Sequence, residues 1–216
     1  MMAGEGSLCL DCQFQVQPVQ LPFCSCCGDP VAGELPGEFL CAWCQKTHPA
    51  FDWARSAVRY TGPVRHCLHA LKYHSGFWVL PDVERWLRAL WNTCPPEAAR
   101  AQAILPVPLH PRKARQRQFN QSALLAAAVS RLSGIPVRPF WLRRGRLTGT
   151  QTHLTAAQRA RNVHGVFEVP WPALVRGRRL LLVDDVMTTG ATLNECAKVL
   201  RAAGAESVGA LTVARG

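Results

Sequence analysis

Residues 180–192 read LLLVDDVMTTGAT, and this stretch decides the fold. Residues 180–183 are a fully apolar run of strand length, and two acids follow it directly. Residues 188–192 are small and polar and lead into a helix-forming segment. Because ligands of open α/β sheets bind at the carboxyl ends of the strands, the stretch predicts a strand, a ligand-binding loop and a helix.

The residue types of this loop fit a phosphorylated ribose. Asp184 and Asp185 are adjacent carboxylates, which are unfavourable at the end of a buried strand unless they meet water, hydroxyls or a cation. A ribose diol supplies such hydroxyls. The backbone N–H groups and threonine hydroxyls that follow, with the positive helix end, suit a phosphate dianion, and glycine permits its close approach. We therefore expect a ribose 5-phosphate group to contact Val183, Asp184, Asp185, Val186, Met187, Thr188, Thr189, Gly190, Ala191 and Thr192.

Two other phosphate-binding motifs are absent from the sequence. It contains neither the Gly-x-x-x-x-Gly-Lys-Ser/Thr loop of nucleotide hydrolases nor the Gly-x-Gly-x-x-Gly dinucleotide motif. A purely structural role would make Asp184 a turn residue and Thr188 or Thr189 a helix cap. The acid pair, the apolar strand and the small-residue turn occur together, which favours ligand binding.

The chain from residue 51 onward alternates apolar strands with amphipathic helices. Strands are predicted at 54–60, 103–107, 137–142, 180–183 and 207–213, helices at 63–73, 80–91, 120–132 and 190–203, and a loop entering a short helix at 143–161. Near-continuous aliphatic strands separated by helices indicate a parallel sheet covered on both faces. The fold class is therefore α/β, with a main domain at 51–216 and a small cysteine-rich module at 1–50.

Composition and charge narrow the function classes. The chain has 216 residues, 48% of them hydrophobic, and no uncharged apolar run approaches the roughly 18 residues of a membrane span. Without a recognisable secretory signal, we expect a cytoplasmic protein with no integral membrane association. The net charge is +11, with arginine clusters at 112–117, 143–146 and 178–179. This charge fits a polyanionic small substrate, nucleic acid, or a merely solvated surface.

Seven of the ten cysteines lie between Cys9 and Cys44. In a reducing compartment such clusters indicate metal ligands, and residues 1–50 are too short and polar to build a core unaided. Three Cys-x-x-Cys pairs occur, and two of them have the spacing of a zinc ribbon. We predict one closed structural zinc site formed by Cys24, Cys27, Cys41 and Cys44.

The remaining cysteines have weaker interpretations. Cys9 and Cys12 lack a second pair, and are either vestigial or competitors for the same zinc, whereas Cys26 is not expected to bind. A dithiol redox motif is the alternative for these pairs, although such motifs normally lie at a strand–helix junction. The isolated cysteines are expected to be buried apolar residues: Cys67, Cys94 and Cys196.

The stretch at 180–192 resembles the phosphoribosyl-pyrophosphate (PRPP) signature of type I phosphoribosyltransferases. It shares the hydrophobic run, two acids, a variable pair and Thr-Thr-Gly-Ala-Thr. The resemblance implies the type I phosphoribosyltransferase fold. It also implies that Asp184 and Asp185 hold the ribose hydroxyls of PRPP, while residues 188–192 hold its 5-phosphate.

Further motifs are similar to those of the ComF family of competence-associated phosphoribosyltransferase-like proteins. They are VPLHP at 107–111, RKARQRQFN at 112–120, TGTQT at 148–152, RARNV at 159–163 and the cysteine-rich start. The resemblance runs from about Cys9 to Arg215. It implies that Pro108, Leu109 and His110 face the pyrophosphate and that residues 115–121 belong to a mobile loop near the site. Residues 51–100, as a hood, and 143–161 would choose the acceptor.

One position departs from the family pattern. Gln118 stands where a glycine is expected, which restricts positive φ in the loop. Arg117 is the preferred pyrophosphate contact because phosphate oxygens suit bidentate arginine, and with Asp184 and Asp185 it completes the predicted catalytic residues. Lys72 is a second candidate contact, the alternative being an exposed helix position. His110 is otherwise a surface turn residue.

Two function hypotheses of different classes follow. The first is a Mg²⁺-dependent phosphoribosyltransferase with a structural zinc ribbon, whose acceptor the sequence leaves open. The second is a non-catalytic PRPP sensor in competence, which engages single-stranded DNA or the DNA-uptake and helicase machinery through its basic surface and zinc ribbon. A zinc-ribbon transcription factor is weakened by the complete α/β domain downstream.

Overall fold

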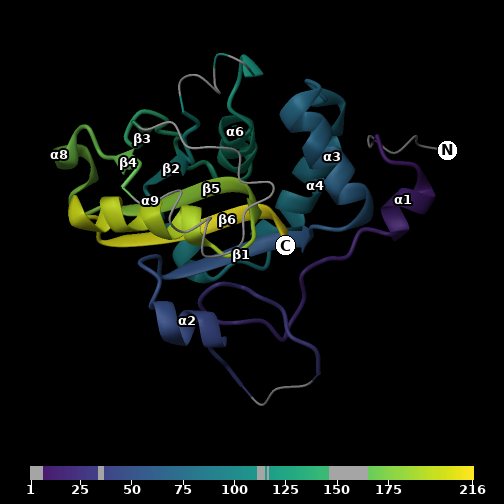
Figure 1. Ribbon diagram of the computed structural model, residues 1–216, viewed down its shortest axis with the longest axis horizontal. Coiled ribbons are helices and arrows are strands. Elements are labelled where there is room, and N and C mark those ends of the chain that lie inside the picture. Colours follow the sequence, from purple (N-terminus) through teal and green to yellow (C-terminus); the bar gives the residue numbers. More distant parts are fainter. Residues whose placement is uncertain (1–6, 34–36, 111–114, 116, 146–164) are drawn as a thin grey trace.

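The computed structural model describes residues 7–33, 37–110, 115, 117–145 and 165–216. Its centre is a parallel sheet of four strands in the order β1–β6–β5–β2 (Figure 1). The strands are β1 (Trp53–Arg59), β2 (Ala103–Pro106), β5 (Arg179–Met187) and β6 (Ser207–Arg215). The central strands β5 and β6 are largely buried along their length, because both of their faces are covered.

Helices cover the sheet on both sides. Helices α3 (Gly62–Tyr73), α4 (Leu80–Trp91) and α6 (Gln121–Ser133) pack on one face, where Leu181 and Val183 of β5 join their hydrophobic core. Helix α9 (Ala191–Ala202) packs on the other face, against Leu180 and Leu182. Successive side chains of β5 therefore pack into two separate hydrophobic cores, because side chains along a strand point alternately to opposite faces of the sheet. None of the helices within the described residues is long and apolar enough to span a bilayer.

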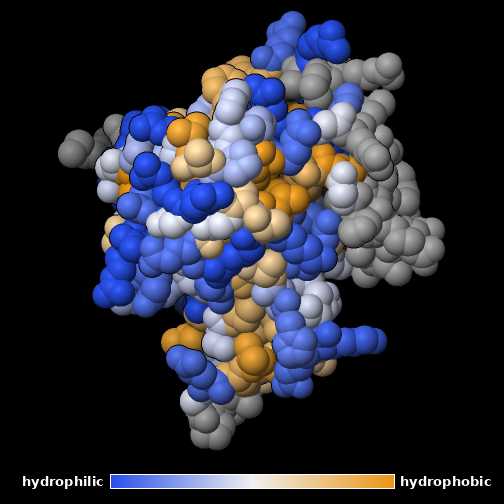
Figure 2. Space-filling model, turned by 90° about the vertical axis from the view of Figure 1, so that its left-hand side faces the viewer, coloured by the Kyte–Doolittle hydropathy of each residue, from blue (hydrophilic) through white to orange (hydrophobic). Residues whose placement is uncertain are grey.

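The cysteine-rich segment contains α1 (Leu10–Phe14) and α2 (Ala42–Thr47), which lie at different places. The part that carries Cys24, Cys27 and α2 packs on the α9 face of the sheet and forms the narrower lower lobe in Figure 2. Helix α1 lies beside α3 and α4 instead (Figure 1), and Leu8 and Val16 on either side of it pack against the core of those helices. Cys24, Cys27 and Cys44 belong to the same hydrophobic cluster as Leu182. Its start is also tied to α4, because the buried carboxylate of Asp82 accepts hydrogen bonds from residues 7 and 8. The division at residue 50 stays a prediction.

Short elements complete the fold. They are the 3-10 helices η1 (Phe77–Val79) and η2 (Pro96–Arg100), the antiparallel pair β3 (Arg143–Arg144) and β4 (Phe167–Glu168), and helix α8 (Pro172–Val175). The predicted strand at 137–142 is wrong: Val137 makes a single parallel bridge to Ile104, and the chain then turns. Prolines at 136 and 139 have no N–H to donate, which prevents a longer ladder. Most of the predicted loop and short helix at 143–161 lies outside the described residues.

Candidate functional site

The loop after β5 lines a cavity of about 830 Å³ at the carboxyl end of the sheet. β5 ends at Met187, and α9 begins at Ala191 with Gly190 as its N-cap at φ +73°. A Cβ on Gly190 would lie 2.7 Å from Met187 Cε and 3.3 Å from Trp43 Cη2. The turn therefore needs glycine for its backbone angle, and a side chain there would also press against Met187 and Trp43. It places the N-terminus of a twelve-residue helix at the cavity.

The opposite wall of the cavity is aromatic and basic. It comes from residue 60 and α3, and from the segment that enters α6. Four cationic side chains are among the described lining residues: Arg65, Lys72, Arg117 and Arg144. Positive charge gathered in a concave site favours a polyanionic small molecule.

The two acids of the loop have different partners. Asp185 is buried and forms an ion pair with Lys72 of α3. Asp184 Oδ1 accepts a 2.8 Å hydrogen bond from Ser122 Oγ at the start of α6 and a 2.9 Å bond from the Asp185 backbone N–H. One carboxylate thus meets a cation and the other a hydroxyl, which are the surroundings that an adjacent acid pair needs.

Burial acts differently on these charged groups. It raises the pKa of Asp184 to about 7, with the Asp185 carboxylate adding to the rise and the Ser122 hydrogen bond opposing it. Burial alone would lower the pKa of Lys72, but the Asp185 carboxylate outweighs it and the pKa is raised. The ammonium group therefore stays charged at the cavity wall. The alternative interpretation of Lys72 as an exposed helix residue is wrong, since only 21% of its side chain is exposed.

The segment before α6 brings an arginine to the cavity. The Arg117 guanidinium lies 4.8 Å from the Tyr73 ring centroid and donates a 3.2 Å hydrogen bond to Gln121 Oε1. Gln118, which stands at the expected glycine, adopts φ +63°. The backbone thus keeps a left-handed conformation despite the side chain, at an energetic cost. Asn120 then caps α6, its Oδ1 accepting from the Ser122 backbone N–H at 3.1 Å.

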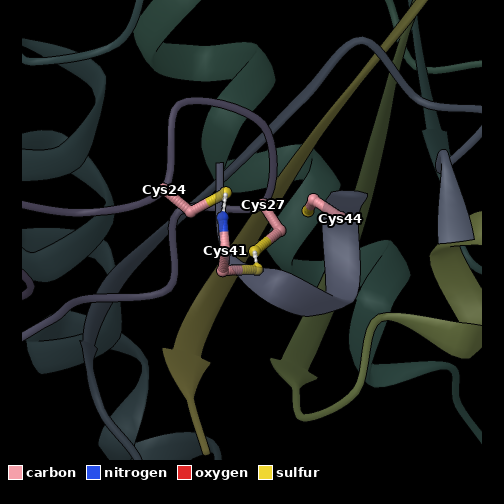
Figure 3. A group of neighbouring side chains, drawn as sticks. All are labelled: Cys24, Cys27, Cys41 and Cys44. Atoms are coloured by element: carbon pink, nitrogen blue, oxygen red, sulfur yellow. Dashed lines mark hydrogen bonds between the residues drawn. The ribbon is translucent and has the colours of Figure 1, made fainter. Parts of the chain in front are cut away.

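Four cysteines form a compact group on the other side of the loop. The sulfurs of Cys24, Cys27, Cys41 and Cys44 all lie within 4.8 Å of one another. Figure 3 shows them converging from the knuckle that carries Cys24 and Cys27 and from the start of α2. The Cys41 backbone N–H donates to Cys24 Sγ at 3.3 Å, and the sulfurs of Cys27 and Cys41 are 3.6 Å apart.

This donor set fits a tetrahedral zinc ion. Four sulfur ligands from two Cys-x-x-Cys pairs make a closed structural site. Although burial opposes ionisation of Cys24, backbone N–H groups of Cys27, Cys41 and Cys26 lower its pKa to about 7. Burial raises the pKa of Cys27 to about 12. A divalent cation would supply the charge that ionises such a buried thiol.

The other cysteines lie outside this group. Cys9 is the N-cap of α1 and Cys12 lies within it, and neither is in the four-cysteine group found among the described residues. Cys26 is also outside the group, and burial raises its pKa. Cys67 and Cys196 are buried as expected, while Cys94 is partly exposed.

Comparisons with known proteins agree with this geometry. A family model described as "Phosphoribosyl transferase domain" matches residues 125–216. Competence protein F of Haemophilus influenzae is 32% identical over 225 residues, covering 98% of this chain and 92% of that protein. DNA utilization protein YhgH of Salmonella typhimurium is 32% identical over 204 residues, covering 93% and 87% respectively. The chain belongs to the competence protein F family.

The fold of this competence protein F family member is that of type I phosphoribosyltransferases, a parallel sheet flanked by helices. Among solved structures, a purine phosphoribosyltransferase from Pyrococcus horikoshii Ot3 shares 14% identity and a TM-score of 0.38, over 65% of this chain and 84% of that one. A glutamine PRPP amidotransferase from B. subtilis shares 24% identity and a TM-score of 0.35, over 52% of this chain and 22% of that one.

The structure gathers most of the predicted site residues of this competence protein F homologue at one cavity. Its described lining includes residues 184–192, Pro108, Leu109, Lys72 and Arg117. Two predicted contacts are not among these lining residues: Val183, which is fully buried in the sheet, and His110. Their roles in ligand binding stay predictions.

Sequence reasoning missed several polar residues of the site, among them Arg65, Ser122 and Arg144. Ser122 bonds directly to Asp184, and Arg144 lines the cavity from β3. Ser122 carried one usable signal, because it lies in the first turn of the helix that follows the basic loop. Arg144 was noticed only as part of an arginine cluster, and nothing in its local sequence indicates that it faces the acids.

Proposed function

We propose that this protein binds PRPP together with Mg²⁺ and transfers its phosphoribosyl group during DNA handling in competent cells. The observation that carries the proposal is the single cavity that brings the acid pair, the Gly190 turn and the basic wall together. The matched phosphoribosyl transferase domain supports the ligand class. The printed names of the relatives, competence protein F and DNA utilization protein, support the cellular setting.

The proposed pose follows from the chemistry of each wall. The ribose hydroxyls would donate to Asp184 and Asp185, and the 5-phosphate would accept from the backbone N–H groups of residues 188–192. The pyrophosphate would lie toward Arg117 and Lys72, whose cationic groups suit its oxygens. The turn at Pro108, Leu109 and His110 would pass beside that end of the ligand.

The chain's own residues would act mainly by positioning. The bond between ribose C1 and the pyrophosphate oxygen breaks, and the electron pair leaves with pyrophosphate. A bond from C1 to an acceptor nitrogen forms, and the proton of that nitrogen passes to the released pyrophosphate or to water. No protein nucleophile is needed, so orientation by the loop and the basic wall is the expected source of rate. The carboxylate oxygens of Asp184 and Asp185 are donors that Mg²⁺ accepts. Bound Mg²⁺ would supply positive charge that offsets the leaving pyrophosphate.

Calorimetric titration with PRPP and Mg²⁺ tests the binding site. The wild-type protein should bind, and the double variant Asp184→Asn, Asp185→Asn should lose detectable binding. Asp52→Asn is the matched control, because Asp52 pairs with Arg201 and is not among the described residues that line the cavity. Unchanged affinity in the double variant would refute the assignment.

A pyrophosphate-release screen separates transfer from mere binding. Purines, pyrimidines and related bases would be offered with PRPP to wild-type protein and to Arg117→Ala. Release with one base, and loss of release in the variant, supports an enzyme. Tight binding without release across the panel favours the sensor role.

A second candidate function is binding of single-stranded DNA. The observation behind it is an aromatic–arginine surface, defined here as Arg138, Phe140, Trp141, Arg143, Trp171 and Arg178, over β3 and α8. Phe140 and Trp171 are 66% and 45% exposed, and the Arg143 guanidinium lies 4.8 Å from the Trp171 ring centroid. Figure 2 looks onto this end of the molecule, where hydrophobic residues lie among hydrophilic ones.

Exposed aromatic faces and arginines are the groups that bind single-stranded nucleic acid, through base stacking and phosphate contacts. Binding of a fluorescent oligothymidylate should therefore weaken steeply with salt. Phe140→Ala with Trp171→Ala should reduce affinity at least about thirtyfold, since each of the two rings would stack one base and each stacked base contributes about 1–3 kcal/mol. Phe14→Ala, which removes an aromatic ring that is 85% exposed on α1, is the control. Equal affinity in all three proteins would refute this surface.

A further inference from the structure

Arg215, the last residue of β6, contacts both the loop and the cysteine group. Its Nη1 donates to the Met187 carbonyl oxygen at 3.0 Å and also to that of Thr188. Its Nη2 lies 3.1 Å from Asp29 Oδ1 and 3.9 Å from Cys27 Sγ. The residue is only 6% exposed. One buried guanidinium therefore joins the backbone of the phosphate loop to the knuckle that carries a predicted metal ligand.

A second contact joins the same two parts. Trp43 lies between the ligands Cys41 and Cys44 on α2. Its ring meets the loop so closely that a Cβ on Gly190 would be 3.3 Å from Cη2. The indole also stacks on Phe51, with ring centroids 6.5 Å apart, which fixes its position. The Cys24–Cys27 half of the cysteine group thus reaches residues 187–190 through Arg215, and the Cys41–Cys44 half reaches them through Trp43.

The knuckle is also held tightly to the sheet. The Ala54 backbone N–H of β1 donates to the Cys26 carbonyl oxygen at 2.7 Å. Gly28, at φ +67°, passes so close that a Cβ there would lie 2.6 Å from the Ala54 carbonyl oxygen. A shift of the knuckle would be passed to its packed neighbours, because protein interiors have few voids to absorb it.

The charge of a loaded metal site strengthens this link. Four thiolates around Zn²⁺ carry a net charge of about −2, so hydrogen bonds to their sulfurs are charge-assisted. Arg215 is a cation at one of these sulfurs. When the metal is bound, the Cys27 sulfur and the Asp29 carboxylate hold the guanidinium from one side, and it holds two loop carbonyls on the other.

We propose that Arg215 is a positioning residue that couples metal occupancy of the four-cysteine cluster to ligand affinity of the phosphate loop. Arg215 binds the carbonyl oxygens of Met187 and Thr188 on the side of the loop away from the cavity. The N–H groups that follow them therefore stay turned toward the cavity. Loss of the metal frees the knuckle, and the loop loses its support. The inference rests on the proposed function, because the ligand is PRPP. Coupling between two binding sites is reciprocal, so PRPP must tighten the metal by the same factor.

The test measures PRPP affinity by calorimetry, with Mg²⁺ present, in zinc-loaded and chelator-stripped protein. Zinc removal should weaken PRPP binding about tenfold in the wild type, which is within the usual range of such couplings. Zinc-loaded Arg215→Met should bind PRPP weakly, and zinc removal should change its affinity less than twofold. Arg179→Met is the matched control, since Arg179 pairs with Glu206 at the other end of β5 and should keep the full tenfold effect.

Three further measurements guard against simple misfolding. Circular dichroism must show native structure in each protein. Asp29→Asn, which alters a partly exposed partner, should weaken PRPP binding to zinc-loaded protein in the same direction as Arg215→Met. Saturating PRPP should slow zinc transfer to a chromogenic chelator in the wild type but not in Arg215→Met.

The outcomes separate the two proposals. If zinc-loaded wild-type protein binds no PRPP, the proposed function and the coupling both fail. If it binds PRPP, but Asp29→Asn and Arg215→Met leave the affinity unchanged and PRPP leaves zinc transfer unchanged, only the coupling is overturned. If stripping zinc unfolds the protein, the Asp29→Asn and zinc-transfer results decide.

Discussion

Ser122 Oγ donates a 2.8 Å hydrogen bond to Asp184 Oδ1, across 62 residues of sequence. The bond joins the first turn of α6 to the end of β5. It favours the ionised carboxylate and opposes the burial that raises the pKa of Asp184 to about 7. The charge of the proposed diol-binding acid therefore depends on one serine that is nearly fully buried.

Ser122→Ala should raise the pKa of Asp184 by about one further unit, since a hydrogen bond to a charged group contributes about 1.5 kcal/mol. A protonated Asp184 accepts hydrogen bonds poorly, so PRPP affinity at pH 7 should fall and recover above pH 8. Carboxyl ¹³C chemical shifts give the titration midpoint. Ser130→Ala is the control, because Ser130 donates to the Ile135 carbonyl oxygen farther along α6. A wild-type midpoint in the Ser122→Ala variant would contradict the assignment.

The raised pKa of Asp184 also predicts how stability varies with pH. The folded protein holds the Asp184 proton more tightly than the unfolded chain, whose carboxyl pKa is about 4. The resulting stabilisation is complete below pH 4 and is lost as the pH rises through 7. Relative to Asp184→Asn, wild-type protein should therefore lose stability between pH 4 and 7. Urea unfolding of both proteins at several pH values measures this difference, and a constant difference would contradict it.

Gln118→Gly should stabilise the protein by about 1 kcal/mol, because a left-handed conformation costs a non-glycine residue about that much. Gln118 has φ +63° and is exposed, so little side-chain packing is lost. Urea unfolding with an unchanged m-value checks the effect. The same substitution at Gln15, exposed but at φ −81°, should destabilise instead. If both substitutions changed the free energy of unfolding in the same direction, the backbone explanation would be excluded.

Much of the fold could be predicted because apolar periodicity is a local signal. Helix α4 has the predicted bounds, and β5 extends the predicted apolar strand through the two acids, because its neighbour β6 pairs with it along its length. The sequence itself argued against the strand predicted at 137–142, because prolines at 136 and 139 interrupt the hydrogen-bond ladder of a sheet. Pairing with β6 set the end of β5, whereas local prolines limited the ladder at Val137.

The site residues, too, fall into those predictable from local sequence and those brought together only by the fold. Residues 184–192 and the cysteine pairs could be predicted from spacing within a short segment. The Lys72 ion pair with Asp185, the Ser122 bond to Asp184 and the Arg215 contact with Cys27 could not. Each joins residues far apart in the chain, and their meeting depends on which faces of α3, α6 and β6 turn toward the loop.

Zinc content should follow the four-cysteine group and not the first cysteine pair. Purified wild-type protein should contain one zinc per chain, and Cys24→Ser should lose it, because a closed site needs all four ligands. The double variant Cys9→Ser, Cys12→Ser should keep one zinc, since these residues lie at the start of α1, outside the group. Elemental analysis measures all three. Loss of zinc in the double variant would show that the first pair contributes ligands.

Gly209→Ala should destabilise the protein by about 1–3 kcal/mol, the usual cost of overpacking a core. Gly209 on β6 faces Trp53 on β1 in register, and a Cβ there would lie 2.6 Å from Trp53 Cε2. The indole is packed in the hydrophobic core and cannot move aside without disturbing the strand pair. Trp53→Phe should recover part of the loss in the double variant, because the smaller ring leaves room for the methyl group. Urea unfolding of all four proteins gives the coupling energy, and strict additivity would contradict a direct clash.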